Sequence, residues 1–474
     1  MKTKIIATVG PASSSEPVLK QLIDAGVDVF RLNFSHGDYD FFENIINTIH
    51  KINKENKTHI AILADLQGPK IRVGKVENDE VILKDNDIIT ITSTECVSTS
   101  SLIYVSYPLL AKEAKKGEKM LIDDGKMLLE VVSTDNKTKI TARVIHGGIL
   151  KSKKGVNLPD TKLSQPSLTE KDKENLDFIL DRKIQWIALS FVRSAKDMAD
   201  LRQYVKKHKR AGKFRLMAKI EKPEAIKDLD AIIGMSDGIM VARGDLGVEF
   251  PLERVPLMQK EIVKKCLLQA KPVVIATQMM ESMITNISPT RAETNDVANS
   301  VLDGADALML SAETSVGEHP VEVVKAMQRI ISFVEDNVDD IYYKNIKPAN
   351  CKDKRYISDS VICQACNLAR QSEAVAIIGM THSGYSAFAI AAQRPKASVY
   401  IYTNNHALLS ILSLVWGVRG FYYDKFVNTD FTIQDIRQHL LEEKMAHKGD
   451  LIVNIASIPL SELGMTNMLK LSKV

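Results

Sequence analysis

A lysine and two carboxylates lie at the ends of two successive apolar segments in the middle of the chain. Lys219 and Glu221 lie two residues apart at the end of Arg215–Ile220, and Asp245 follows Gly238–Ala242. Residues two apart on a strand point to the same face. Two converging carboxylates favour a hard divalent cation, Mg²⁺ or Mn²⁺, and the lysine supplies positive charge where a substrate becomes negative. The spacing therefore indicates metal-assisted chemistry on an anionic substrate.

A network of surface ion pairs is the competing interpretation for each of these residues taken alone. Clustered charges mark functional sites in only part of the cases. The three residues are grouped at neighbouring strand ends, and Gly244 lies directly beside Asp245. This grouping favours a functional site over a solvated surface network.

The elements that position these residues follow a regular alternation. Short apolar segments alternate with amphipathic helical patterns, which is typical of βα units around a parallel sheet. The strands are continuously apolar, as expected when both faces are buried. Eight such units favour a TIM (β/α)8 barrel over a doubly wound open sheet, because no GxGxxG or Walker motif follows a strand. The predicted strands are Lys4–Val9, Val29–Phe34, Ile60–Leu66, Trp186–Phe191, Arg215–Ile220, Gly238–Ala242, Pro272–Ala276 and Ala307–Leu310.

The alternation is interrupted after the third strand. Short alternating segments separated by Gly, Asn and Asp turns predict an inserted all-β domain. This insertion falls in a βα loop, on the barrel face where active sites form, and such a domain can close over a substrate and exclude water. The predicted domains are the barrel (1–69 and 166–345), the inserted β-barrel lid (70–165) and a C-terminal α/β domain (346–474).

Polar side chains, and a glycine beside one of them, lie at or just beyond the carboxyl ends of most predicted barrel strands, where TIM-barrel enzymes place their catalytic groups. They combine cations that suit phosphate with carboxylates that suit a metal, which is the equipment of phosphoryl transfer. No Cys–His or Ser–His–Asp arrangement is indicated. These residues are Arg31, Asn33, Ser35, His36, Asp65, Lys70, Arg72, Lys219, Glu221, Arg243, Gly244, Asp245, Thr277, Ser311 and Glu313.

Composition excludes several classes of protein. The net charge of +4 over 474 residues is too small for a dedicated nucleic-acid binder. No apolar run approaches the roughly 20 residues that a membrane span needs. Five cysteines at scattered spacing do not form a disulfide framework, so a reduced, cytoplasmic setting is expected. Cys363 and Cys366 lie in a helical pattern and are interpreted as plain helix thiols, and the sequence does not define a redox role for them.

Read in order, the motifs resemble those of pyruvate kinase, and the match covers nearly the whole chain. The resemblance implies a barrel, a β lid and a C-terminal α/β domain, assembled as a homotetramer. It also implies transfer of a phosphoryl group from phosphoenolpyruvate to ADP, the last step of glycolysis, with Mg²⁺ or Mn²⁺. The motifs are TKIIATVGPAS, FRLNFSHG, LADLQGPKIR, GVNLP, MAKIEKP, MVARGDLGVE, IATQMMESM, PTRAETNDVANSVLDGADALMLSAETSVGEHP and GMTNMLK.

The resemblance also implies a role for individual residues. Glu221 and Asp245 are expected to hold the Mg²⁺, and Lys219 to stabilise the transferring phosphoryl group. Thr277 is expected to anchor a water relay near the carbon that takes up a proton. The residues expected to bind phosphoenolpyruvate are Arg31, Lys219, Gly244, Asp245 and Thr277. Those expected to contact ADP or ATP are Asn33, His36, Arg72 and Lys154.

One departure from the common family pattern concerns potassium. Most members need a monovalent cation, and the positions that would hold it here are Asn33, Ser35, Asp65 and Leu66. Those members carry a glutamate where this chain has Lys70, in the segment DLQGPKIRV. The chain therefore resembles the potassium-independent branch, because the ammonium of Lys70 can supply the positive charge of the ion. We expect that potassium is not required.

A second departure concerns regulation. The family often binds a sugar phosphate in its C-terminal domain, at a Ser/Thr-rich loop that begins a helix and suits anions, so a sugar-phosphate or nucleotide effector is expected here. That loop corresponds here to Thr381, His382, Ser383, Gly384, Tyr385 and Ser386. A second loop lacks the usual glycines and reads Ser457, Ile458, Pro459, Leu460 and Ser461. A plain helix cap is the alternative interpretation of the first loop.

Two other functions are compatible with the fold. An aldolase would use Lys219 as a Schiff-base nucleophile, which requires a desolvated lysine of lowered pKa. The adjacent Glu221 favours a charged lysine instead. A sensor that retained the fold without catalysis would have lost a metal or phosphate ligand. In this chain, the residues expected to bind metal and phosphate are all present, which disfavours a sensor.

Overall fold

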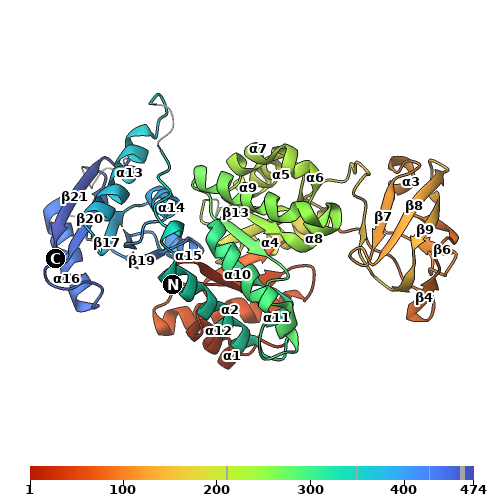
Figure 1. The fold of residues 1–474 in the computed structure, drawn as a ribbon, viewed down its shortest axis with the longest axis horizontal. Coiled ribbons are helices and arrows are strands. Elements are labelled where there is room, and N and C mark those ends of the chain that lie inside the picture. Colours follow the sequence, from red (N-terminus) through yellow and green to blue (C-terminus); the bar gives the residue numbers. More distant parts are fainter. Residues whose placement is uncertain (210–211, 348–350, 426–427, 459–464) are drawn as a thin grey trace.

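A closed barrel of parallel strands forms the centre of the molecule (Figure 1). The computed structural model describes residues 1–209, 212–347, 351–425, 428–458 and 465–474. Within these residues the barrel closes in the order β1-β16-β15-β14-β13-β12-β3-β2, which confirms the predicted TIM barrel. Its strands are β1 (Lys4–Thr8), β2 (Val29–Asn33), β3 (Ala61–Asp65), β12 (Trp186–Val192), β13 (Arg215–Ile220), β14 (Gly238–Ala242), β15 (Val273–Ala276) and β16 (Ala307–Leu310).

Each predicted barrel strand agrees with the observed one to within one residue at either end. The reason is burial: almost every residue of these strands is shielded from solvent, because the interior and the helices cover both faces. Capping defines several helices of the outer layer. Thr290 and Glu293 form a reciprocal capping box at the start of α10, and Gly304 ends that helix at φ +99°.

The outer layer contains more helices than the sequence pattern predicts. Two short helices follow β13 in place of one, and the GDLG sequence lies in a short helix where a turn is the usual interpretation. The helices around the barrel are α1 (Glu16–Asp24), α2 (Tyr39–Asn56), α4 (Glu170–Leu180), α5 (Ala195–Lys206), α6 (Pro223–Lys227), α7 (Leu229–Met235), α8 (Arg243–Glu249), α9 (Val255–Leu268), α10 (Arg291–Asp303), α11 (Ala312–Ser315) and α12 (Pro320–Asn337).

The lid is a separate β unit with its own apolar core, on the right of Figure 1. It contains a sheet in the order β11-β7-β8-β9-β5-β6 and a smaller pair, β10-β4. The chain leaves the barrel after β3 and returns before α4. The lid elements are β4 (Glu80–Leu83), β5 (Ile88–Thr92), β6 (Leu102–Tyr104), α3 (Leu110–Glu113), β7 (Lys119–Ile122), β8 (Met127–Thr134), β9 (Lys139–His146), β10 (Gly148–Lys151) and β11 (Val156–Asn157).

The C-terminal domain packs on the side of the barrel away from the lid (Figure 1). Its sheet has the order β19-β18-β17-β20-β21, with β21 antiparallel to its neighbour. The exact boundaries predicted for the barrel, the lid and the C-terminal domain remain predictions. The elements are α13 (Tyr356–Gln371), β17 (Ala376–Met380), α14 (Tyr385–Ala392), β18 (Ser398–Thr403), α15 (His406–Leu412), β19 (Val418–Tyr422), α16 (Thr429–Glu442), β20 (Leu451–Ala456) and β21 (Met468–Lys473).

A buried ion pair joins the barrel to the C-terminal domain. Arg394, 1% exposed, lies 3.0 Å from Asp306 and stacks 4.7 Å from the ring centre of Trp416. The other tryptophan, Trp186, donates to the carbonyl of Ile411 at 3.2 Å. Both tryptophans of the chain therefore lie at this junction.

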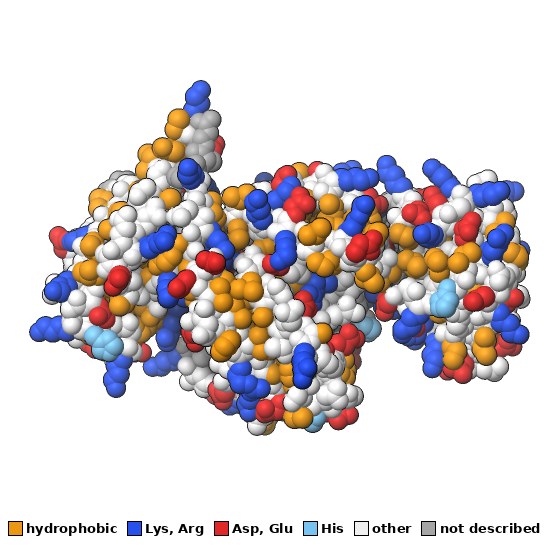
Figure 2. Space-filling model, in the orientation of Figure 1, with side chains coloured by type: hydrophobic (Ala, Val, Ile, Leu, Met, Phe, Trp, Pro, Cys, Tyr) orange, Lys and Arg blue, Asp and Glu red, His pale blue; other side chains and the backbone are white. Residues whose placement is uncertain are grey.

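The surface carries no dominant charge on the face drawn in Figure 2, where acidic and basic side chains are interspersed. This distribution agrees with the small net charge. None of the helices in the described part of the chain combines the length and the apolar character needed to cross a membrane.

We predict that Arg394→Met destabilises the protein by about 3–5 kcal/mol, because it leaves the Asp306 carboxylate buried without its partner. Urea denaturation followed by tryptophan fluorescence measures the loss, since both fluorophores report on this junction. Lys396→Met is the matched control, because Lys396 pairs with Asp339 at the exposed surface. Equal denaturation midpoints for the two variants would contradict the prediction.

Candidate active site

A network of buried charges lies at the carboxyl ends of the barrel strands. The ammonium of Lys219 on β13 lies 3.0 Å from a carboxylate oxygen of Glu221 and 3.2 Å from one of Asp65. Arg31 on β2 lies 2.7 Å from the other oxygen of Asp65. All four residues are at most 9% exposed. The barrel thus brings two cations and two carboxylates from three strands into one contact network.

The charges of this network fix its protonation states. Burial alone would lower the pKa of Lys219, but Asp65 and Glu221 outweigh it and raise that pKa above the ordinary lysine value. Burial alone would raise the pKa of Asp65, but Lys219 and Arg31 lower it. Lys219 is therefore a charged electrostatic group at neutral pH, whereas a Schiff-base nucleophile requires the opposite shift.

Glu221 and Asp245 have the properties of a site for a divalent cation. One oxygen of Glu221 accepts a hydrogen bond from the Phe191 N–H at 2.7 Å, and the other is buried without an aligned hydrogen bond. Burial raises the pKa of Glu221, and Asp245 raises it further against the opposing charge of Lys219. A bound cation would offset both the burial of the Glu221 carboxylate and its repulsion from Asp245, and would therefore lower the pKa of Glu221. Across the described residues, no group of three or more His, Cys, Asp or Glu side chains could hold a metal.

Lys70 approaches one of these carboxylates, Asp245, from the lid side. Its ammonium lies 3.5 Å from Asp245. The positions corresponding to the family's monovalent-cation ligands are engaged within the protein: Asp65 contacts Arg31 and Lys219, and the Leu66 carbonyl accepts from Ser190 at 2.7 Å. The side chain of Asn33 accepts from the Ser35 N–H at 3.2 Å.

Thr277 lies beside Gly244 in a strained backbone conformation. Its φ of +71° is unusual for a β-branched residue. The Gly244 N–H donates to the Thr277 hydroxyl at 2.7 Å, and that hydroxyl donates to the Ala276 carbonyl at 2.6 Å. Arg243 donates to the Thr277 carbonyl at 2.9 Å and pairs with Asp296 at 2.6 Å. Arg243 thus holds the strained segment in place, a role that the sequence alone does not identify.

The residues expected to contact nucleotide are divided between the barrel and the lid. Burial and the positive charges of Arg72, Lys70 and Arg31 lower the pKa of His36, so these groups lie in one electropositive region. Arg72 donates to the Lys153 carbonyl at 3.1 Å. Lys154 lies 2.9 Å from Asp123 of the lid itself. Binding of a nucleotide by Lys154 therefore requires that this ion pair be shared or broken.

Two functional features escaped the sequence analysis. The first is Ser190 on β12, whose hydroxyl accepts from the Lys219 ammonium at 2.7 Å. The same strand-end rule applied to β12 would have identified it. The second is a buried cluster in which Glu249 contacts Lys222 of the barrel and accepts from Asn157 of the lid at 2.8 Å. No local sequence signal joins these three residues, because they are distant in the chain.

The loop predicted to bind an effector begins α14 in the C-terminal domain. The Gly384 N–H donates to the Thr381 hydroxyl at 3.1 Å, so the loop carries part of its own helix cap. The imidazole of His382 contacts Asn404 at 2.9 Å, and Ser386 is buried without a hydrogen-bond partner for its hydroxyl. From the second loop, Pro459, Leu460 and Ser461 lie outside the described residues.

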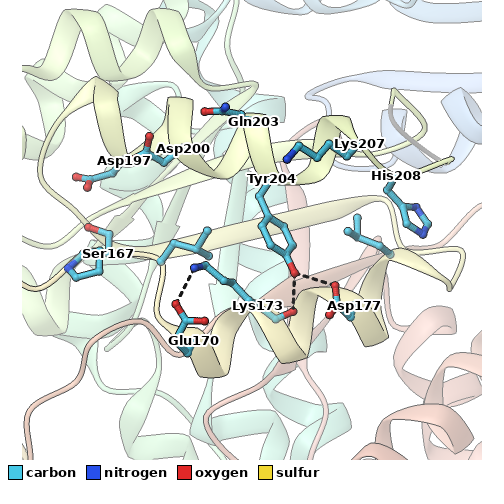
Figure 3. Close-up of a pocket in the computed structure, with 13 residues that line it drawn as sticks. Ser167, Glu170, Lys173, Asp177, Asp197, Asp200, Gln203, Tyr204, Lys207 and His208 are labelled. Carbon is cyan, nitrogen blue, oxygen red and sulfur yellow. Dashed lines mark hydrogen bonds and ion pairs between the residues drawn. The ribbon is translucent and has the colours of Figure 1, made fainter.

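A wide groove on the outside of the barrel is distinct from this site. It has a cavity volume of about 620 Å³ and lies between α4 and α5 (Figure 3). Its polar groups pair with each other: the Tyr204 hydroxyl donates to Asp177 at 2.9 Å, and Lys173 contacts Glu170 at 2.7 Å. The charged network at the strand ends is therefore the stronger candidate for catalysis.

Family models and similar proteins from several organisms all point to the same family. A family model described as "Pyruvate kinase, barrel domain" matches residues 1–324, and one described as "Pyruvate kinase, alpha/beta domain" matches residues 359–472. The pyruvate kinase of Geobacillus stearothermophilus is 42% identical over 99% of this chain and 80% of its own length. That of Mycobacterium tuberculosis is 38% identical over 99% of this chain and 98% of its own length.

A solved structure has the same fold. The crystal structure of a pyruvate kinase from Cryptosporidium parvum has a TM-score of 0.93 and 33% sequence identity. The match covers 100% of this chain and 96% of that one.

We predict that Gly68→Ala destabilises the protein more than Gly117→Ala does. Both glycines have positive φ, +67° and +87°, so both substitutions carry backbone strain. A Cβ at Gly68 would also lie 2.9 Å from the Phe191 ring, whereas a Cβ at Gly117 meets nothing within 4 Å. Thermal melting of both variants measures the difference. Equal shifts in melting temperature would show that the contact between a Cβ at position 68 and the Phe191 ring does not reduce stability.

Proposed function

The chain belongs to the pyruvate kinase family of phosphotransferases, and from this we propose that it transfers the phosphoryl group of phosphoenolpyruvate to ADP, giving pyruvate and ATP. The observation that carries the proposal is the buried contact network of Lys219, Glu221, Asp65 and Arg31 at the strand ends. Phosphoryl transfer depends mainly on positioning and on stabilising negative charge, and these residues suit both tasks.

In this proposal, Glu221 and Asp245 hold a divalent cation, Mg²⁺ or Mn²⁺. When bound, the cation neutralises charge on the substrate oxygens. The two carboxylates differ in exposure: the Glu221 side chain is 1% exposed and that of Asp245 is 25% exposed. Glu221 thus serves as the fixed ligand, and Asp245 lies where substrate can share the cation.

Phosphoenolpyruvate would lie with its phosphate toward Arg31 and Lys219 and its carboxylate toward Gly244 and Thr277. Transfer breaks the bond between phosphorus and the enol oxygen and forms one between phosphorus and a terminal oxygen of ADP. Lys219, kept charged by its neighbours, stabilises the charge that spreads over the phosphoryl oxygens. The enolate left behind takes up a proton at its methylene carbon. Thr277, held by the Gly244 N–H, anchors the water that delivers this proton.

The nucleotide would bind between barrel and lid, at Asn33, His36, Arg72 and Lys154. The two connections between these units allow the lid to approach the strand ends and exclude water. Water exclusion strengthens the electrostatic interactions inside the site and prevents hydrolysis of the phosphoryl group.

Lys70 supports activity without potassium. Its ammonium lies close to Asp245, in the region whose positive charge also lowers the pKa of His36. A fixed positive charge there can take the place of a monovalent ion in balancing the substrate phosphates. We therefore propose that the enzyme does not require potassium.

Further parts of the proposal follow from the family. The enzyme would act in glycolysis in the cytoplasm and would assemble as a homotetramer. A sugar-phosphate or nucleotide effector would bind at the loop from Thr381 to Ser386, next to the start of α14. The aldolase alternative is disfavoured, because the raised pKa of Lys219 keeps that lysine protonated.

We predict that the protein forms pyruvate from phosphoenolpyruvate and ADP, and that Glu221→Gln lowers kcat by at least about 100-fold because one cation ligand loses its charge. Pyruvate release is measured directly, and Mn²⁺ binding to the enzyme without substrates is measured by titration calorimetry. Glu322→Gln on the outer helix α12 is the control and should bind Mn²⁺ and react like the unmodified protein. Absence of pyruvate formation by the unmodified protein at saturating Mg²⁺ would refute the proposed reaction.

We predict that Lys70→Glu makes activity depend on potassium, because the substitution replaces a fixed cation by an anion next to Asp245. Rates are compared in potassium chloride and in tetramethylammonium chloride at equal ionic strength. The unmodified protein should show equal rates in both salts, and Lys70→Gln separates the loss of positive charge from the gain of negative charge. Unchanged activity of Lys70→Glu without potassium would exclude the role of Lys70.

A further inference from the structure

The fourth barrel strand, β12, carries a bulge at its carboxyl end. Its pairing with β13 shifts register between Leu189 and Val192, and Phe191 has a φ of +55°. In a regular strand, the side chains of Ser190 and Phe191 would point to opposite faces of the sheet. A bulge redirects the backbone locally, and bulges are common next to active sites. Here both the Ser190 side chain and the Phe191 N–H reach the same charged network.

The bulge contacts two different members of this network. The Ser190 hydroxyl accepts from the Lys219 ammonium at 2.7 Å and donates to the Leu66 carbonyl at 2.7 Å. The Phe191 N–H donates to Glu221 at 2.7 Å, on the oxygen that does not face Lys219. One strained segment therefore contacts both the proposed phosphoryl-stabilising lysine and the proposed metal ligand.

An ammonium has three donors, and Lys219 has three acceptors within reach. They are Ser190 at 2.7 Å, Glu221 at 3.0 Å and Asp65 at 3.2 Å. Two of these are carboxylates, and Ser190 is the neutral acceptor, which lies nearest to the ammonium. Loss of Ser190 would leave the ammonium only the two carboxylates as acceptors, and it already lies 3.0 Å from the Glu221 oxygen that the Phe191 N–H does not contact.

The bulge is itself held by both connections to the lid. The Ser167 hydroxyl, on the returning connection, donates to the Phe191 carbonyl at 2.8 Å. Gly68, on the outgoing connection, packs so closely that a Cβ there would lie 2.9 Å from the Phe191 ring and 3.0 Å from the Ser190 Cβ. The segment is thus fixed from outside while it contacts the charged groups inside.

We propose that Ser190 and the Phe191 N–H form a positioning element that sets the distance between Lys219 and Glu221, so that the lysine serves the phosphoryl group while Glu221 stays open to the cation. This inference rests on the proposed function. Ser190 is a positioning residue in this proposal, because it acts through its hydrogen bond with Lys219. Its loss should reduce turnover and metal affinity without abolishing the fold.

The test compares Ser190→Ala with Ser190→Cys, which restores the volume but supplies only a weak acceptor. Ser236→Ala is the matched control, because Ser236 is also fully buried and donates to the Ile232 carbonyl at 2.7 Å, at the end of α7. Melting temperature, kcat, KM for phosphoenolpyruvate and calorimetric Mn²⁺ affinity without substrates are measured for all three.

Both Ser190 variants should lose about 10–100-fold in kcat, with KM near that of the unmodified protein and weaker Mn²⁺ binding. Ser236→Ala should lower the melting temperature without changing kcat or Mn²⁺ affinity. Unchanged kcat in Ser190→Ala, or recovery in Ser190→Cys, would overturn the inference in favour of simple packing. If the unmodified protein forms no pyruvate, the proposed reaction fails, and Mn²⁺ affinity alone then decides whether Ser190 positions the carboxylate.

Discussion

The contact between one buried ammonium and two buried carboxylates is the interaction on which this structure depends. Lys219 could not remain charged in the barrel without Asp65 and Glu221, and these carboxylates could not remain ionised without Lys219 and Arg31. Each charge is tolerated only because the others are present. Parallel strands make the arrangement possible, because residues distant in sequence emerge side by side at one end of a closed barrel. The lid and the β12 bulge then act on groups that are already mutually restrained.

A helix or strand could be predicted from the sequence only where the residues of that segment themselves show a recognisable pattern. The barrel strands were predictable because burial on both faces makes them continuously apolar. The short helices α6, α8 and α11 were not, because fewer than two turns leave no helical period to recognise. Strand β19 was not predicted either, for a different reason. Strand β19 contains Arg419 and Gly420, which interrupt the apolar pattern.

The candidate site likewise contains some residues that the local sequence indicates and others that only the fold brings together. Lys219 and Glu221 were proposed from their spacing, because alternation along a strand is a local property, and Asp245 was proposed from its position just after the next strand. Ser190 was hidden inside an otherwise apolar strand, and nothing local signals the register shift that brings the Phe191 N–H to Glu221. The pairing of Lys154 with Asp123 depends on how the lid strands fold together, and the contact of Asn157 with Glu249 depends on where the lid lies relative to the barrel. Such contacts are products of the fold and can be read only from it.

The apolar cores have a consequence for how this architecture can be divided. The interior of the barrel continues into the C-terminal domain as one cluster that includes Trp186, Met217, Ile390 and Leu412, whereas the lid encloses a cluster of its own. A cut between barrel and C-terminal domain would expose a large apolar surface on both pieces. A cut at the two lid connections would leave the apolar core of the lid intact. The lid thus has an apolar core independent of the barrel, whereas the barrel and the C-terminal domain share one.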